Sequence, residues 1–172
     1  MHRNDHALQL VVTSEPTTQE LYNLLGRYCL PFEDLVLTNM RQVLGSGYRN
    51  GAYQLRRYFN GAFALVLPVE DGLVTATLGQ VEESFSLEAA SYLCSLLALS
   101  QLITVAHTRN DHDDHSRLHY LYYGLLEVLR ADPTFAATAT APHHRPLTDE
   151  EARVSGSLAP FAYQPAIERL LD

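Results

Sequence analysis

The sequence has few cysteines, and they do not form a metal-binding pair. Its two cysteines, Cys29 and Cys94, lie far apart, so neither a disulfide framework nor a zinc knuckle is indicated. Cys94 falls in an apolar stretch, where a small buried thiol is the common role. We therefore expect reduced thiols and a cytoplasmic protein.

Positive charge is also scarce. Twelve Lys and Arg residues stand against 20 Asp and Glu residues, which gives a formal net charge of −8. Proteins that hold the phosphate backbone carry a basic surface, so direct nucleic-acid binding is not expected. An acidic chain can mimic DNA instead, but here the carboxylates are scattered and their excess is of the size that keeps many proteins in solution.

Membrane-spanning runs and catalytic motifs are missing as well. No apolar run reaches the roughly 18 residues that a spanning helix needs, and the first residues do not have a signal-peptide pattern. No serine lies in a GxSxG motif, and no HExxH is present. We expect no membrane segment, no enzymatic activity and no cofactor.

A β-hairpin within residues 48–68 is the central feature that the sequence does contain. Apolar-rich runs at residues 52–59 and 62–67 flank Asn60 and Gly61. Asn-Gly is the strongest short hairpin signal, because a type I′ turn needs positive φ at both central residues. Asn60 and Gly61 are therefore predicted to be structural turn residues. A turn signal at residues 69–72 and a run at residues 73–78 extend the hairpin to a meander.

Helical periodicity surrounds this predicted sheet. The fold class we predict is α+β, a single domain in which an antiparallel meander of three to four strands packs against several helices. Residues 1–135 form this domain, and residues 136–172 form a C-terminal extension of a linker and short helices. A short strand is expected at residues 7–12, and helices at residues 18–28, 32–44 and 87–102, and after the polar segment that ends at His119.

A histidine-rich segment runs from His107 to His119. His115 and His119 are four residues apart at a predicted helix start, and His112 precedes them, so these three are the metal-ligand candidates. The aspartates between them could complete a ligand set. No further metal motif supports this interpretation, and histidines among aspartates on a polar segment are commonly just solvated, so no metal site is expected.

Tyrosine and arginine gather around the predicted sheet. The side chains expected to be exposed there are Tyr48, Arg49, Arg56 and Arg57. Tyrosine and arginine are enriched at protein interfaces. These four residues are the candidates for contact with a protein partner.

Several motifs, taken in order, resemble the ArdB/KlcA family of antirestriction proteins. They are Leu30-Pro31 before an amphipathic helix, Tyr48 with Gly51 and Tyr53, then Asn60-Gly61-Ala62-Phe63 ending at Pro68, the helix start Phe85-Ser86-Leu87-Glu88-Ala89-Ala90, and Tyr122-Tyr123-Gly124 before Asp132-Pro133. The resemblance covers roughly residues 30–135. Tyr53 stands where the family tends to have Trp, and Ala62 where it has Gly.

The resemblance implies a non-enzymatic inhibitor of type I restriction–modification systems, carried on a mobile genetic element, that binds a host defence complex. Two other functions remain open. One is a metal- or small-ligand-binding protein that uses the segment from His107 to His119. The other is a structural or adaptor module whose tail docks onto a partner or onto a second copy in a homodimer.

Overall fold

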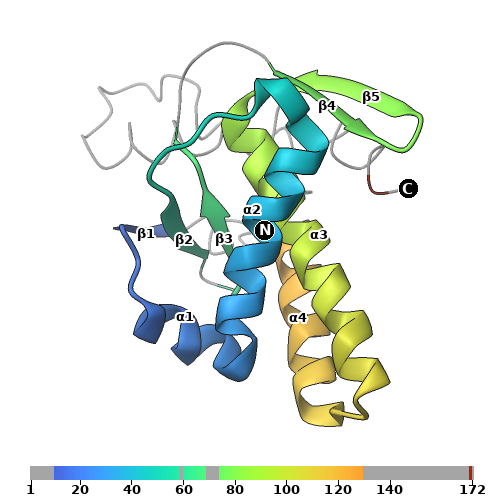
Figure 1. The fold of residues 1–172 in the computed structure, drawn as a ribbon. Helices are drawn as coiled ribbons and strands as arrows, with labels where there is room; N and C mark the ends of the chain where they lie inside the picture. Colours follow the sequence, from blue (N-terminus) through green and yellow to red (C-terminus); the bar gives the residue numbers. More distant parts are fainter. Residues whose placement is uncertain (1–9, 59, 69–73, 130–170, 172) are drawn as a thin grey trace, which may run out of the picture.

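The computed structural model describes residues 10–58, 60–68, 74–129 and 171, and within them the chain has the predicted α+β fold (Figure 1). The elements in chain order are β1 Leu10–Ser14, α1 Thr18–Leu25, the 3-10 turn η1 Gly26–Tyr28, α2 Cys29–Leu44, the 3-10 turn η2 Gly45–Gly47, β2 Gln54–Tyr58, β3 Phe63–Val66, β4 Val74–Leu78, β5 Val81–Phe85, α3 Leu87–Thr108 and α4 His112–Leu129. Most of the predicted extension lies outside the described residues, but Leu171 packs against the core.

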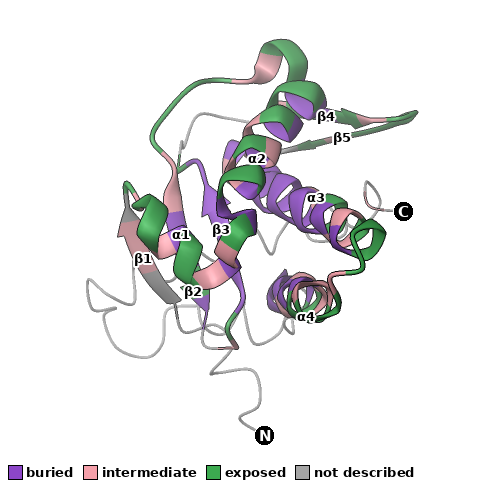
Figure 2. Ribbon diagram, turned by 60° about the horizontal axis from the view of Figure 1, so that its bottom comes forward, coloured by how far each residue is buried: buried purple, intermediate pink, exposed green. Residues whose placement is uncertain are grey.

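Helix α3 is the centre of the fold and is buried along most of its length (Figure 2). Ser86 caps it by accepting a hydrogen bond from Ala89 N at 3.1 Å. The helix has 22 residues and ends at Thr108, six residues beyond the predicted Leu102. By length and composition alone it is apolar enough to cross a membrane, but 67% of its apolar stretch is buried inside the protein. Helices α2 and α4 both pack on it.

Helix α2 begins at Cys29, three residues before the predicted start at residue 32. Pro31 lies in its first turn, where the missing backbone N–H has no helical partner to lose. Asn39 falls on the apolar stripe and is buried, and its Nδ2 donates to Gln101 Oε1 at 3.1 Å and to Cys94 O at 3.4 Å. A polar link therefore fixes α2 on α3.

Strands β1, β2 and β3 form an antiparallel sheet in that order. The strand predicted at residues 7–12 is β1, although residues 7–9 lie outside the described part. Leu55 pairs with Leu65, and Arg57 with Phe63, so these four point to one face. That face meets α2, because the rings of Phe63 and Phe32 pack edge to face at 5.4 Å. The opposite face meets α3.

The third strand of the predicted meander belongs to another sheet. β4 covers the predicted run but pairs with β5, a strand that the sequence did not indicate, and the two form a separate ribbon. Leu78 pairs with Val81 across a tight turn in which Gly79 has φ 63°. β5 begins with Val81 and carries two glutamates, so its apolar signal is weak.

The hairpin between β2 and β3 closes with a three-residue loop, not with the predicted two-residue type I′ turn. A two-residue turn at Asn60 and Gly61 would pair Arg57 with Ala64, whereas Arg57 pairs with Phe63. Tyr58 N donates to Ala62 O at 2.8 Å, and Gly61, at φ 86°, donates to Tyr58 O at 3.0 Å. Gly61 is thus a structural turn residue, as predicted.

Two serines of α3 hydrogen-bond the outer edge of β3. Ser95 Oγ accepts from Leu65 N and donates to Leu65 O, both at 3.2 Å, as a paired strand residue would do. Ser91 Oγ accepts from Leu67 N and donates to Leu87 O, both at 2.9 Å. Buried backbone groups need partners, so these hydroxyls let a helix cover a sheet edge.

We predict that Ser95→Ala lowers the free energy of unfolding by about 1–3 kcal/mol, because it leaves the buried Leu65 N–H without a partner. Urea denaturation followed by circular dichroism measures the loss. Ser100→Ala, on the exposed side of the same helix, is the control and should change stability by less than about 0.5 kcal/mol. Equal effects of the two substitutions would contradict the role given to Ser95.

Candidate protein-interaction surface

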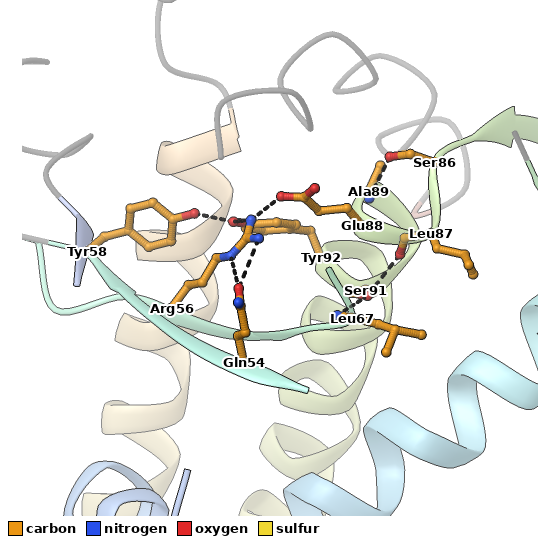
Figure 3. Close-up of polar contacts among 10 residues, drawn as sticks. All are labelled: Gln54, Arg56, Tyr58, Leu67, Ser86, Leu87, Glu88, Ala89, Ser91 and Tyr92. Carbon is orange, nitrogen blue, oxygen red and sulfur yellow. Dashed lines mark hydrogen bonds and ion pairs between the residues drawn. The ribbon is translucent and has the colours of Figure 1, made fainter. Parts of the chain in front are cut away.

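Arg56 does not lie on the surface as predicted. Its side chain is 5% exposed and turns toward α3, where it pairs with Glu88 and donates to Tyr92 Oη at 3.3 Å (Figure 3). Gln54 Oε1 accepts a hydrogen bond from Arg56 Nη2 at 3.2 Å. Arg56 is covered by α3, whereas the neighbouring Arg57 is exposed, so the polarity of the two side chains did not show which of them meets water.

The Arg56 network is fully paired and holds β2 against α3. The hydroxyls of Tyr58 and Tyr92 share a hydrogen bond, and the two rings lie 6.5 Å apart. Burial raises the pKa of both tyrosines, so both stay neutral. Burial also works to lower the pKa of Arg56, but Tyr92 and Glu88 outweigh it and the net direction is upward. These side chains stabilise the fold and leave no group free for a partner.

The other three interaction candidates lie nearer to solvent. Tyr48 is half-buried in the loop between α2 and β2, and its ring lies 5.9 Å from the guanidinium carbon of Arg41. Arg49 follows it and is exposed, and Arg57 is exposed on β2. Tyr48 is the candidate that the structure places at a hollow.

This hollow, which we call the α2 groove, has a volume of about 370 Å³. One wall is the face of α2 that carries Glu33, Leu37 and Arg41. The β1–α1 turn, α1, β3 and the loop from Tyr48 to Tyr53 complete it. The volume is within the range of small-ligand and peptide-side-chain pockets. Sequence reasoning missed Glu33, Leu37 and Arg41, although their four-residue spacing beside the apolar stripe of α2 was a usable signal.

The walls of the α2 groove contain two unusual features. The Tyr53 hydroxyl is buried and has no hydrogen-bond partner among the described residues. Burial, and after it the neighbouring Tyr48 phenol, raises the pKa of Tyr53, so the hydroxyl keeps its proton. Glu15, at the β1–α1 turn, has φ 52°, a left-handed conformation that is costly for a residue with a Cβ. Orphaned polar atoms and strained backbone are common at binding sites.

Gly51 keeps the loop wall of the α2 groove in place. A Cβ at this position would lie 2.6 Å from Leu67 Cδ1, so a larger residue would require the buried Leu67 side chain to move. The glycine that belongs to the family-like motif thus has a packing role here.

The histidine candidates form a ladder of rings on α4 and the end of α3. The ring centroids of His107 and His115 lie 5.6 Å apart, those of His115 and His119 4.6 Å, and those of His119 and Tyr123 5.8 Å. Within the described residues, which include this whole segment, no group of three or more His, Cys, Asp or Glu side chains is arranged to hold a metal ion. His112 is exposed at the start of α4 and has no ring contact with the others among those described.

Arginines pair with two of the aspartates that could have completed a metal site. Asp111 pairs with Arg27 and accepts a hydrogen bond from the Tyr28 hydroxyl at 3.3 Å. Asp114 pairs with Arg117 and lies 3.5 Å from Arg27 Nε. These contacts tie the start of α4 to α1 and η1, so the carboxylates have a structural role.

A second exposed feature is a pair of tyrosines on α4 that the sequence analysis did not single out. Tyr120 and Tyr123 are 65% and 59% exposed, and they border a hollow of about 330 Å³ beside the hairpin. Asn60 Nδ2 donates to Gly124 O at 2.9 Å, and Tyr120 Oη donates to Asn60 O at 3.1 Å. Asn60 therefore also anchors the hairpin on α4, beyond its predicted role in the turn. Exposed aromatic side chains favour protein contacts.

No protein-family model and no curated protein sequence matches the chain. The fold of this chain, which has a three-stranded sheet and a separate two-stranded ribbon, is similar to that of a solved structure. That match is to the structure of the KlcA and ArdB proteins, described as a novel fold with antirestriction activity against type I DNA restriction systems in vivo but not in vitro.

The likeness spans nearly the whole of both proteins. The TM-score is 0.55 at 21% sequence identity, and the match covers 87% of this chain and 94% of the other. At this identity the likeness establishes the fold. The resemblance predicted from the ordered motifs is therefore confirmed as a shared fold. The low sequence identity shows that this chain is divergent.

We predict that Arg56→Ala lowers the free energy of unfolding by about 3–5 kcal/mol, because it removes a buried guanidinium and leaves the partly buried Glu88 carboxylate without its cation. Equilibrium unfolding in urea measures the loss. Arg57→Ala, one residue along and exposed, removes the same charge and should cost less than about 0.5 kcal/mol. A similar loss for both would show that Arg56 is not the anchor of β2.

We also predict that stability falls as the pH drops through the ordinary histidine pKa of 6.5. Partial desolvation and the neighbouring His119, His107 and His112 lower the pKa of His115 in the folded protein, so the unfolded chain binds this proton more readily. The contribution is complete above 6.5 and is lost progressively below it.

The measurement is the melting temperature of the wild type and of His115→Gln at a series of pH values. The variant should show a weaker dependence between about pH 5 and pH 7, and high salt should weaken the dependence of the wild type by screening the imidazolium repulsion. Parallel curves for the two proteins would remove His115 as a source of the effect.

Proposed function

We propose that this protein is an antirestriction protein that relieves type I DNA restriction by binding a protein of the restriction complex, without catalysis. The observation that carries the proposal is the shared fold with KlcA and ArdB, which covers 94% of that chain. The order of the motifs from Leu30 to Pro133 supports it.

The charge of the chain supports a protein partner over DNA. The net charge is −8, and Arg56, one of the arginines beside the sheet, is paired and buried. DNA backbone binding needs several exposed cations on one surface. The exposed tyrosines of α4 and the α2 groove are features of the kind that proteins use to bind one another.

The metal-binding alternative receives less support. Two of the aspartates beside the histidine ladder, Asp111 and Asp114, are engaged by Arg27 and Arg117. The ladder has instead the character of an aromatic surface, continued by Tyr123. We therefore place the histidines on the protein-contacting side of α4.

We predict that expression of the protein restores the plating of unmodified phage on a host with a type I restriction system. The structural neighbour shows its activity in vivo but not in vitro, so the assay is done in cells. Plating efficiency should rise to within a factor of a few of that on an isogenic host without the restriction subunit.

Modified phage on the same host, and unmodified phage on the non-restricting host, should plate equally with and without the protein. Arg56→Ala at matched expression is the destabilised control and should relieve restriction less. If restriction is unchanged while the soluble wild-type protein accumulates, the proposed function is wrong. If an affinity-tagged chain captures the restriction complex from the same cells, the protein acts by binding that complex.

A further inference from the structure

We propose that the α2 groove binds an extended segment of a partner protein, with an acidic residue at the Arg41 end, a basic residue at the Glu33 end and apolar residues between them. The inference rests on the proposed function only in assigning that segment to the restriction complex. Binding of a peptide of this chemistry follows from the groove itself.

The donors at one end of the groove define the acidic position. Arg41 is exposed in the last turn of α2, over the ring of the half-buried Tyr48. A guanidinium and a phenol offer N–H and O–H donors, and a carboxylate is the acceptor that satisfies several donors at once.

The other end of the groove is acidic. Glu33 lies eight residues before Arg41 on the same helix, so the two are separated by about 12 Å along its axis. Glu33 is half-buried, and Glu15 also lines the hollow. A Lys or Arg side chain of the partner fits this end, since its apolar stem can lie on the groove wall while its charge meets the carboxylate.

Apolar side chains line the groove between the two charges. Val36 and Leu37 of α2 and Leu65 of β3 form this stretch, and the first and last of these are buried. An extended chain advances about 3.3 Å per residue, so about 12 Å corresponds to residues three to four positions apart. The groove therefore favours a segment whose acidic and basic residues bracket two or three apolar ones.

The direct test is selection from a phage-displayed heptapeptide library on the immobilised full chain. The wild type should enrich peptides with an acidic and a basic residue three or four positions apart, in one order. The charge swap Glu33→Arg with Arg41→Glu should enrich the opposite order. The matched control Glu82→Arg with Arg109→Glu keeps the same net charge outside the groove and should enrich the same peptides as the wild type.

A second variant separates binding from folding. Arg41→Gln removes an exposed charge from α2, so its melting temperature should be nearly unchanged. The same variant should bind the selected wild-type peptide severalfold more weakly, because the acidic residue of the peptide loses its guanidinium partner. An Arg41 with a purely structural role would not give this combination.

Selection of no charge-paired peptide by the wild type, or the same order from the charge swap, would overturn the inference, as would full peptide affinity in Arg41→Gln. These results come from purified protein, so they do not depend on the outcome of the plating assay. Conversely, if the protein selects these peptides but leaves restriction unchanged, the proposed antirestriction function is wrong and the peptide-binding role of the α2 groove stands.

Discussion

The hydrogen bonds between α3 and the edge of β3 are the constraint on which the rest of this structure depends. A helix that is apolar on all sides can be buried, but it cannot ordinarily cover a sheet edge, because the edge presents unpaired N–H and C=O groups. Ser95 solves this by bonding both groups of Leu65, and Ser91 by bonding Leu67. With β3 held in this way, α3 can pack α2 on one flank and α4 on another. Serine side chains are small enough for α3 to lie close to the edge of β3. Their hydroxyls reach the backbone groups of that edge only when α3 lies this close.

The buried Arg56 sets the register between the sheet and α3. A buried ion pair adds little net stability over a well-packed apolar pair, but it penalises any arrangement that separates its partners. Arg56 reaches Glu88, in the first turn of α3, and Tyr92, one turn later. A shift of β2 by one residue would turn Arg56 to the α2 face of the sheet and leave Glu88 without its ion-pair partner. The network therefore selects one alignment among several that would bury similar apolar area.

Much of the fold could be predicted from local pattern, and the failures have physical causes. The 3.6-residue periodicity located α2, α3 and α4, and the turn chemistry located the β2–β3 hairpin. The loop length of that hairpin was wrong because Asn60 is held by Gly124, sixty-four residues away, and no local rule contains that contact. β5 was missed because its glutamates mask the strand pattern. For the site, Tyr48 was found because it stands beside the hairpin, whereas Arg56 was misplaced because a charged side chain in an alternating strand normally faces water. The α2 groove needed the fold, since Glu33 of α2 and Tyr53 of the following loop line one hollow only because α2 packs on the sheet.

The residues that carry the family-like motifs have structural roles, which limits what those motifs say about the target. Gly51 lets its loop lie close against Leu67. Ala62 lies where α4 approaches the hairpin closely, because a Cβ added at Gly124 would be 3.4 Å from the Cβ of Ala62. Phe63 packs on Phe32, and Asn60 anchors the hairpin. A sequence can keep all of these and so keep the fold at 21% identity, while its exposed residues change freely. The choice of partner must then depend on side chains outside the motifs. Those along α2 and on the exposed face of α4 are the ones that the fold leaves free to vary without loss of packing.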